Sequence, residues 1–213
     1  MTQIAKKYDL IMMGATGFTG RLVAGHIHAN GAEISWAIAG RNDAKLKQIQ
    51  SEFAPSADII VADSLSEESM TALAQQTRVV ASTAGPFAQL GSALVAACSK
   101  HGTDYVDITG ETQWIRHTID AHHEAAKASG ARIIHCCGFD SIPSDLGVHL
   151  LAKTMRTQTS KLECLGILTK MRGGLSGGTF ASMQNLVKTA SDRDVARILA
   201  HPLSLNPKPL PNT

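Results

Sequence analysis

The sequence predicts an α/β fold in which a doubly wound parallel sheet is covered by helices on both faces. Short apolar runs alternate with longer segments of helical period, which is the pattern of βαβ units. The runs are apolar enough to be buried on both sides, as strands of parallel sheets are. The composition, 44% hydrophobic and 18% charged, is typical of a globular protein. The six expected strands are Tyr8 to Met13, Ile34 to Ala39, Ala57 to Val61, Val79 to Thr83, Tyr105 to Ile108 and Arg132 to Cys136.

Helices are expected between these strands, because apolar residues recur there at helical spacing. The first helix should stop at Asn30-Gly31 in left-handed backbone, and the fifth should close at Ser129-Gly130. Ser66, followed by two acidic residues, should cap the third. The apolar positions of the five helices are Phe18, Leu22, Val23 and Ile27; Leu46, Ile49 and Phe53; Met70 and Leu73; Leu90, Leu94 and Cys98; and Trp114, Ile115, Ile119 and His122.

A glycine-rich loop, Gly14-Ala15-Thr16-Gly17-Phe18-Thr19-Gly20, follows the first strand and opens the first helix. A helix N-terminus offers free backbone amides and a positive dipole to a phosphate. Gly14 would permit the tight turn, Gly17 would let the backbone approach a pyrophosphate, and Gly20 would let the helix pack close to the sheet. In this setting the spacing G-x-x-G-x-x-G predicts a Rossmann-type domain that binds a dinucleotide.

Arg41 indicates which dinucleotide is bound. It follows the second strand about 20 residues beyond the loop, where domains specific for NAD carry an acidic residue. A guanidinium there suits the 2′-phosphate of NADP, so NADP is the expected cofactor and NAD the less favoured one. One charge-assisted hydrogen bond contributes roughly 1.5 to 3 kcal/mol, or about 10- to 150-fold in affinity. The alternative is a solvated arginine. Asn42 could donate to the same phosphate or cap the next helix.

Two further loops at strand ends are expected to contact the dinucleotide. Asp63 follows the third strand and should lie near the adenine, although a role in capping the helix at Ser66 is an equal alternative. Thr83, Gly85 and Pro86 follow the fourth strand, on the side of the switch point where the nicotinamide half of a dinucleotide lies. The alternative is that these residues only shape a rigid loop.

The domain organisation is expected to change near residue 151. Residues 1–150 should form the dinucleotide-binding domain, and residues 151–200 should begin a second α/β domain that is incomplete. That beginning contains a strand-like segment at 162–170, a glycine-rich corner at 173–178 and a helix from Phe180 to about Ala190. Four prolines within residues 201–213 predict an extended, poorly ordered tail.

Charge and hydropathy disfavour nucleic acid and a membrane-spanning segment as settings for this chain. A net charge of +2 gives no broad basic field for nucleic acid. The stretch without charged residues, Val79 to Ser99, is interrupted by Gly85, Pro86 and Gly91, so a spanning helix is not expected. Peripheral contact with a membrane remains open. The N-terminus lacks a secretory signal, which predicts a cytoplasmic location.

Several kinds of chemistry are also disfavoured. Neither Tyr8 nor Tyr105 begins the Tyr-x-x-x-Lys pair with which short-chain dehydrogenases protonate substrate. No metal site is expected, because His117, His122 and His123 lack the i, i+4 spacing that places two rings on one helix face. The cysteines contain no C-x-x-C pair and are interpreted as reduced, mostly buried thiols. They are Cys98, Cys136, Cys137 and Cys164.

In combination, five sequence blocks resemble the saccharopine dehydrogenase-like oxidoreductases, and most nearly the branch that includes the mycobacterial trans-acting enoyl reductase. The resemblance covers about residues 8 to 190. The blocks are the glycine loop, Ala39-Gly40-Arg41-Asn42, Thr83 to Phe87, Gly102 to Asp107 with Thr109-Gly110-Glu111, and Cys137 to Asp145.

The resemblance implies an NADP-binding Rossmann domain, followed by a mixed α/β domain that closes over the nicotinamide and commonly dimerises. It also implies reductase chemistry. In the enoyl-reductase branch this is hydride delivery to a carbon-carbon double bond of a lipid or glycolipid precursor, whereas other members reduce imines formed from amino acids. A small-molecule or acyl-lipid substrate is therefore expected. Family members are nearly twice this long, so we expect a truncated member, able to form a homodimer only if the second domain were complete.

Asp140 and Glu111 are the candidates for a catalytic role. Asp140 follows the sixth strand and Glu111 the fifth, both at the carboxyl edge where ligands bind. The alternative near Asp140 is helix capping, with Ser144 or Asp145 as the cap. Besides a reductase, two functions remain open: an NADP-binding sensor without turnover, which would fit the absence of an obvious proton donor, and an inactive truncated fragment.

Overall fold

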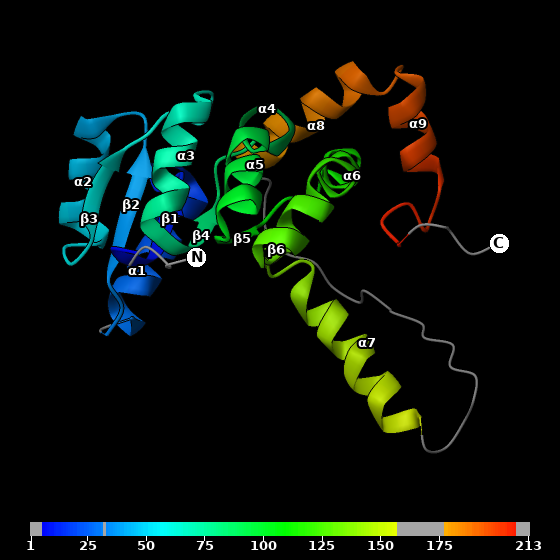
Figure 1. Ribbon diagram of the computed structural model, residues 1–213, viewed down its shortest axis with the longest axis horizontal. Coiled ribbons are helices and arrows are strands. Elements are labelled where there is room, and N and C mark those ends of the chain that lie inside the picture. The colour runs from blue at the N-terminus through cyan, green and yellow to red at the C-terminus, as the bar shows by residue number, and fades with distance from the viewer. Residues whose placement is uncertain (1–5, 32, 157–176, 208–213) are drawn as a thin grey trace.

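The fold is known from a computed structural model that describes residues 6–31, 33–156 and 177–207. Its body is a six-stranded parallel sheet in the order β3-β2-β1-β4-β5-β6 (Figure 1). The order reverses between β1 and β4, which is the switch point of a Rossmann sheet. The predicted fold class is confirmed. The strands are β1 (Tyr8–Met13), β2 (Trp36–Gly40), β3 (Asp58–Val61), β4 (Thr77–Ser82), β5 (Asp104–Asp107) and β6 (Ile133–Ile134).

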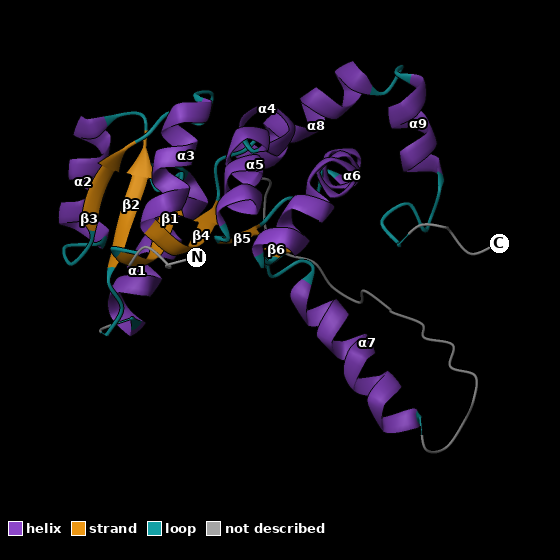
Figure 2. Ribbon diagram, in the orientation of Figure 1, coloured by secondary structure: helices purple, strands orange, loops and turns teal. Residues whose placement is uncertain are grey.

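Helices cover the sheet in two layers (Figure 2). They are α1 (Phe18–Asn30), α2 (Asp43–Phe53), α3 (Glu67–Gln76), α4 (Phe87–Leu90), α5 (Ser92–His101) and α6 (Thr112–Ser129). On one face α1 and α2 pack against Trp36 and Ile38, and on the other α3, α5 and α6 pack against residues that include Ala37 and Ala39. These four residues of β2 alternate between the faces, so both faces of the central strands are buried.

The prediction that every strand is buried on both faces is wrong for the two edge strands. Val61 of β3 is exposed, and β6 is only two residues long, with Ile134 50% exposed. An edge strand has a hydrogen-bonded neighbour on one side only, and among the described strands β3 pairs only with β2 and β6 only with β5. Apolar composition alone did not separate central strands from edge strands.

The predicted apolar stripe of α1 is also wrong in part. Phe18 is 61% exposed and Leu22 is exposed, whereas Gly20 and Ala24 are the buried positions. The helix lies so close to the loop before it that only small side chains fit at the contact. Gly31 ends α1 with φ −107°, so the expected left-handed stop is wrong as well.

Other helix ends agree with the prediction. Ser66 caps α3 by accepting a hydrogen bond from the Ser69 amide at 3.1 Å, and Gly130 closes α6 at φ +81°. Cys98 is fully buried against the sheet, as expected for α5, and burial raises the pKa of its thiol to about 12.

The part of the chain after β6 is organised differently. α7 (Ile142–Met155) projects away from the sheet (Figure 1), and none of its residues is buried. Ser141 occupies the N-cap position, so the predicted cap at Ser144 or Asp145 is wrong; Asp145 lies in the first turn. α8 (Gly177–Thr189) confirms the predicted helix, and α9 (Arg193–Ala200) was not predicted. The predicted strand at 162–170 and the corner up to residue 176 lie outside the described residues.

The expected disordered tail is wrong for residues 201–206. This segment forms turns against α6, and Ser204 is buried. The guanidinium of Arg116 donates to the carbonyl oxygens of Ser204 and Asn206 at 3.2 and 3.3 Å. The buried guanidinium of Arg116 on α6 therefore orders this segment, although its prolines predicted a poorly ordered tail.

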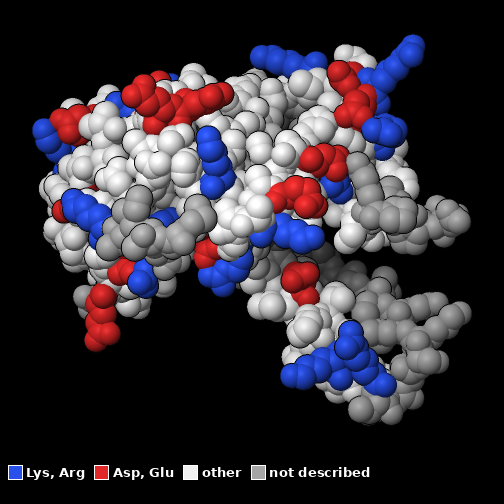
Figure 3. Space-filling view, viewed as in Figure 1, with Lys and Arg blue, Asp and Glu red and all other residues white. Residues whose placement is uncertain are grey.

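The surface carries charges of both signs. Acidic and basic side chains are interspersed over the body in the view of Figure 3, and basic side chains gather at the far end of α7. Within the ranges that the structure describes, no helix is both long and apolar enough to cross a membrane.

Candidate dinucleotide site

The glycine loop forms a tight connection between β1 and α1. Gly14 has φ +88°, and a Cβ there would lie 2.8 Å from the backbone nitrogen of Ala84. A Cβ on Gly20 would lie 2.2 Å from the carbonyl oxygen of Gly14. Both contacts are with backbone, which cannot yield as a flexible side chain can. The loop therefore needs glycine at both ends.

The N-terminus of α1 leaves its backbone amides without a side-chain cap, as the N-termini of α5 and α6 also do. Gly17 occupies its N-cap position, no side chain accepts from its amides, and its first turn contains no acidic residue. By contrast, α2, α3 and α9 are capped by the side chains of Asn42, Ser66 and Asp192. Uncapped amides at the positive end of a helix, reached over glycines, suit the pyrophosphate of a dinucleotide.

Arg41 and Asn42 lie beside this loop at the end of β2. The β1 end is tied to β2 by hydrogen bonds from the Gly14 and Ala15 amides to the Ala39 carbonyl. Arg41 is exposed and forms no ion pair with an acidic residue in the described ranges. The Asn42 side-chain oxygen accepts from the Lys45 amide at 2.9 Å, which leaves the side-chain nitrogen of Asn42 as a donor. The two alternatives for Asn42 are thus compatible.

Asp63 shapes the next loop along this edge. Its carboxylate accepts from the Leu65 amide at 3.0 Å, and its own amide donates to the Ser69 hydroxyl at 3.0 Å. These bonds build the turn that leads into α3. Contact with an adenine stays a prediction.

A cleft of ≈ 630 Å³ opens on the other side of the loop. It lies between the start of α1, the segments that follow β4, β5 and β6, and the helix α8. Predicted residues that line it are Gly17, Phe18, Thr19, Thr83, Gly85, Glu111 and Asp140. Lining residues that the prediction missed include Phe87, Ile108, Ser182, Met183, Leu186 and Leu199. Segments that are far apart in the sequence meet at this cleft. For example, the Thr83 hydroxyl after β4 donates to the Gly14 carbonyl after β1 at 3.3 Å.

Glu111 is buried at the rim of this cleft and its carboxylate is fully engaged. Its two oxygens accept from the Phe87 and Ala88 amides at 2.8 and 3.0 Å, and from the Ser182 hydroxyl at 2.8 Å. Glu111 thus caps the short helix α4 and attaches α8 to the cleft. This geometry makes it a positioning residue, while its candidacy as a catalyst stays a prediction.

Asp140 is exposed and lines the same cleft. It lies in the turn between β6 and α7, and a Cβ on Gly138 would come within 2.6 Å of the Asp140 carboxylate. The neighbouring thiol of Cys136 has its pKa raised, first by burial and then by the charges of Asp107 and Asp140. A thiol in this state is a poor nucleophile, in line with the expectation that these cysteines are structural.

The comparisons with known proteins concern the region just described. The family described as the saccharopine dehydrogenase NADP binding domain matches residues 10–134, which include the whole parallel sheet except the start of β1. The chain belongs to this family. A Mycobacterium tuberculosis protein with the provisional name of trans-acting enoyl reductase is 39% identical over 97% of this chain, and the trans-acting enoyl reductase of Mycobacterium leprae is 36% identical over 96%.

This chain spans about half the length of those relatives, 51% in each case. Among solved structures, saccharopine dehydrogenase (L-Glu forming) from Saccharomyces cerevisiae is similar in fold. Its TM-score is 0.54 at 18% identity, over 70% of this chain and 32% of that one. The family is defined by NADP binding, so the cofactor expected from Arg41 agrees with the family match. No cluster of three metal-binding side chains occurs among the described residues.

Proposed function

We propose that this chain is the NADP-binding part of an NADPH-dependent reductase, and that the substrate is an enoyl group of an acyl-lipid precursor. One observation carries the proposal: the amides at the N-terminus of α1 have no side-chain cap and Gly17 at this N-terminus lines the cleft, whereas α2, which follows Arg41, is capped by Asn42. The relatives named trans-acting enoyl reductase support the reaction class.

Each part of the carboxyl edge has a role in this proposal. The Gly14 to Gly20 loop binds the pyrophosphate, Arg41 and Asn42 bind the 2′-phosphate, and Asp63 lies near the adenine. Thr83, Gly85 and Pro86 flank the nicotinamide half. When bound there, the reduced nicotinamide supplies the hydride.

The cleft provides a suitable setting for an apolar substrate. Phe87, Ile108, Met183 and Leu186 line it together with the polar groups of the loops. Apolar walls exclude water from the reacting atoms. Enoyl reduction adds a hydride to one carbon and a proton to its neighbour, and we propose Asp140 as the group that holds or relays the proton, because it is the exposed carboxylate that lines the cleft.

A second candidate is a sensor that binds NADP without turnover. The engagement of Glu111 favours it, because both carboxylate oxygens are used to hold Phe87, Ala88 and Ser182. Oxidation of NADPH in the presence of an enoyl thioester, absent without it, would favour the reductase. Tight binding of NADPH with no oxidation by enoyl or imine substrates would favour the sensor. Dimerisation, a cytoplasmic location and membrane contact stay predictions.

The cofactor assignment is tested by measuring the dissociation constants of NADPH and NADH by calorimetry. Replacing Arg41 with Ala should weaken NADPH by about 10- to 150-fold and leave NADH almost unchanged. Arg78→Ala is the matched control, because Arg78 is an exposed arginine on β4 with a 3.6 Å ion pair to Asp9, at the amino edge of the sheet. An Arg41→Ala variant that keeps the NADPH preference of the wild type would refute the assignment.

A further inference from the structure

Asp107 and His135 form a buried pair of an acid and a histidine behind the cleft. Neither residue was predicted to have a role in the site. Asp107 ends β5, and its carboxylate accepts a hydrogen bond from Nδ1 of His135 at 2.7 Å. The exposed fractions of the two side chains are 0% and 7%. The imidazole ring is held edge-on to the rings of Trp114 and Tyr105, with centroids 5.0 and 5.9 Å away. The pair therefore has one defined geometry.

The other groups of Asp107 hold two loops in place. Oδ1 accepts from the Thr109 amide at 3.1 Å and from the Cys136 amide at 3.2 Å, and the Asp107 carbonyl accepts from the Cys137 amide at 2.7 Å. Cys136 has φ 60°, a left-handed conformation that is strained for a residue with a Cβ. Asp107 thus stabilises the turn that leads to Gly138 and Asp140.

Both of these loops form walls of the cleft. The β5 loop contributes Ile108 and Thr109, and the β6 loop contributes Asp140. The Thr109 hydroxyl accepts from the amide of Glu111, whose carboxylate holds the segment after β4 and α8. A continuous set of hydrogen bonds therefore runs from Asp107 to the nicotinamide side of the cleft, and none of these bonds involves the Gly14 to Gly20 loop.

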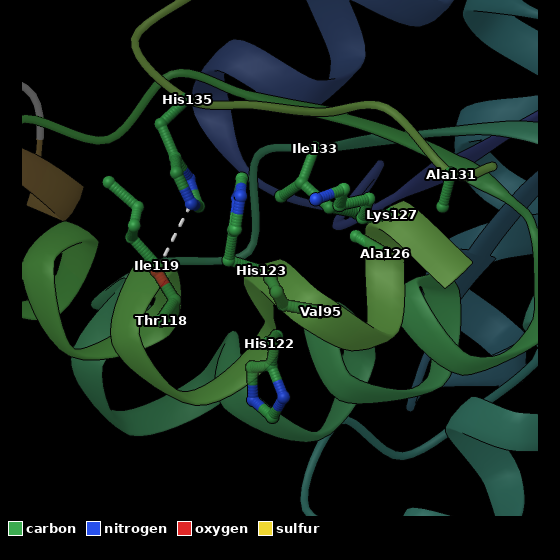
Figure 4. Close-up of a pocket in the computed structure, with 10 residues that line it drawn as sticks. All are labelled: Val95, Thr118, Ile119, His122, His123, Ala126, Lys127, Ala131, Ile133 and His135. Carbon is green, nitrogen blue, oxygen red and sulfur yellow. Dashed lines mark hydrogen bonds between the residues drawn. The ribbon is translucent and has the colours of Figure 1, made fainter. Parts of the chain in front are cut away.

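His135 also faces a second cavity, of ≈ 200 Å³, between α6 and β6 (Figure 4). Among the described residues, none lines both this lateral cavity and the cleft. His135 Nε2 lies 3.2 Å from the Thr118 hydroxyl, which is the bond drawn as a dashed line in Figure 4. Val95, Ile119 and Ile133 supply apolar lining. The imidazole therefore separates a solvent-accessible cavity from Asp107.

We propose that Asp107 and His135 form a positioning pair that sets the nicotinamide side of the cleft, and that the His135 ring closes a path from the lateral cavity to Asp107 which a small heteroaromatic base could enter if the ring were removed. The inference rests on the proposed binding of NADP. It adds that the nicotinamide half of the site depends on a buried pair, whereas the adenine half, at the ends of β1 and β2, does not.

Asp107→Ala tests the first part, with two probes measured by calorimetry. NADPH occupies both halves of the proposed site, and adenosine 2′,5′-bisphosphate occupies only the adenine half. We expect NADPH to bind about 10-fold more weakly or worse, and adenosine 2′,5′-bisphosphate to change by less than about twofold. Asp107→Asn keeps an oxygen acceptor for the Thr109 and Cys136 amides but turns an N–H donor toward Nδ1 of His135, so it should recover only part of the NADPH affinity. Equal weakening of both probes, or of neither, would overturn the inference.

His135→Ala tests the second part by chemical rescue. Removing the His135 ring joins the lateral cavity to the space beside Asp107. Free imidazole has the size of the missing ring and the same N–H donor for Asp107. NADPH affinity should fall in His135→Ala and rise again with added imidazole, while Asp107→Ala should gain nothing. His122→Ala is the matched control, because His122 lines the same cavity and, in the described structure, forms no hydrogen bond with Asp107. Failure of imidazole to restore NADPH binding would refute access through the cavity.

If His135→Ala does not fold, His135→Asn serves in its place, because the Asn side-chain nitrogen can donate to Asp107 from nearly the position of Nδ1. It should bind NADPH almost as the wild type does, and a loss as large as that of Asp107→Ala would contradict the proposed pair. A wild-type protein that binds neither probe would refute the proposed function, and the inference with it. A wild type that binds both, with Asp107→Ala unchanged, would refute the inference alone.

Discussion

The sheet half of the molecule and the helices after it are stabilised in different ways. In the sheet half, Ile11, Met12, Ile38, Leu46 and Leu94 are fully or almost fully buried. In α7 and α8 no residue is buried, and Leu150 is 64% exposed. The sheet half thus closes a core from its own residues. The helices after it depend on what they contact, and in the described structure these contacts are few.

Polar groups make most of the attachments between the two regions. Arg116 binds the carbonyls of residues 204 and 206, His117 pairs with Asp194 at 2.9 Å, and Ser182 donates to Glu111. Of the three described helices after the sheet, only α9 adds buried apolar side chains, Val195 and Ile198. Directional bonds can therefore place a helix over a cleft without a large apolar interface, but the placement depends on a few residues.

The largest expected difference concerns glycines in the two regions. Gly20→Ala should reduce the free energy of unfolding by about 3 kcal/mol or more, because its Cβ would overlap the Gly14 carbonyl. Gly147→Ala, in the middle of α7, meets nothing within 4 Å and should stabilise the helix by about 1 kcal/mol. Urea denaturation measures both. Equal destabilisation by the two variants would show that the regions do not differ as described.

An intermediate effect is expected at Arg116, which is buried and bonded to Asp120 as well as to residues 204 and 206. Arg116→Met leaves the carbonyl of the buried Ser204 unpaired, which costs about 2 kcal/mol locally. Hydrogen exchange should quicken in residues 193–206 and stay unchanged in β1 and β4. Arg132→Met is the control, because Arg132 forms an exposed pair with Asp104 whose loss should cost under about 1 kcal/mol. Quickened exchange throughout the sheet would contradict a local role.

The smallest effect is a pH dependence of the attachment of α9. A hydrogen bond with His117 and then one with Arg197 lower the pKa of the Asp194 carboxyl. The pKa of the Asp194 carboxyl is lower when α9 is docked than when it is free, where the usual value is about 4. The ionised carboxylate therefore stabilises docking above about pH 4, and this contribution is lost as the pH falls through the lowered pKa. Exchange of α9 amides should therefore quicken below about pH 4 in the wild type. Asp194→Asn should lose this dependence, and a dependence that persists in it would assign the effect to another group.

Much of the dinucleotide half could be predicted from local patterns. The cap at Ser66 and the left-handed Gly130 depend on residues a few positions apart, so the sequence shows them directly. The burial of Gly20 and Ala24, with Phe18 left exposed, could not be predicted in this way, because it depends on which side of α1 faces its own loop and the sheet. The two candidate acids also looked alike in sequence, but Glu111 is bonded to three groups, whereas Asp140 is exposed.

By itself the sequence determined the parallel sheet, the glycine loop and the expected preference for NADP, because strand period, positive backbone angles and the residue after β2 are local properties of a chain. Only the tertiary structure decided that Glu111 holds α4 and α8, that Arg116 orders residues 201–206, and that Asp107 and His135 pair behind the cleft. These contacts join residues up to 90 positions apart. Such separations along the chain are closed only when the sheet and the helices on it are packed together.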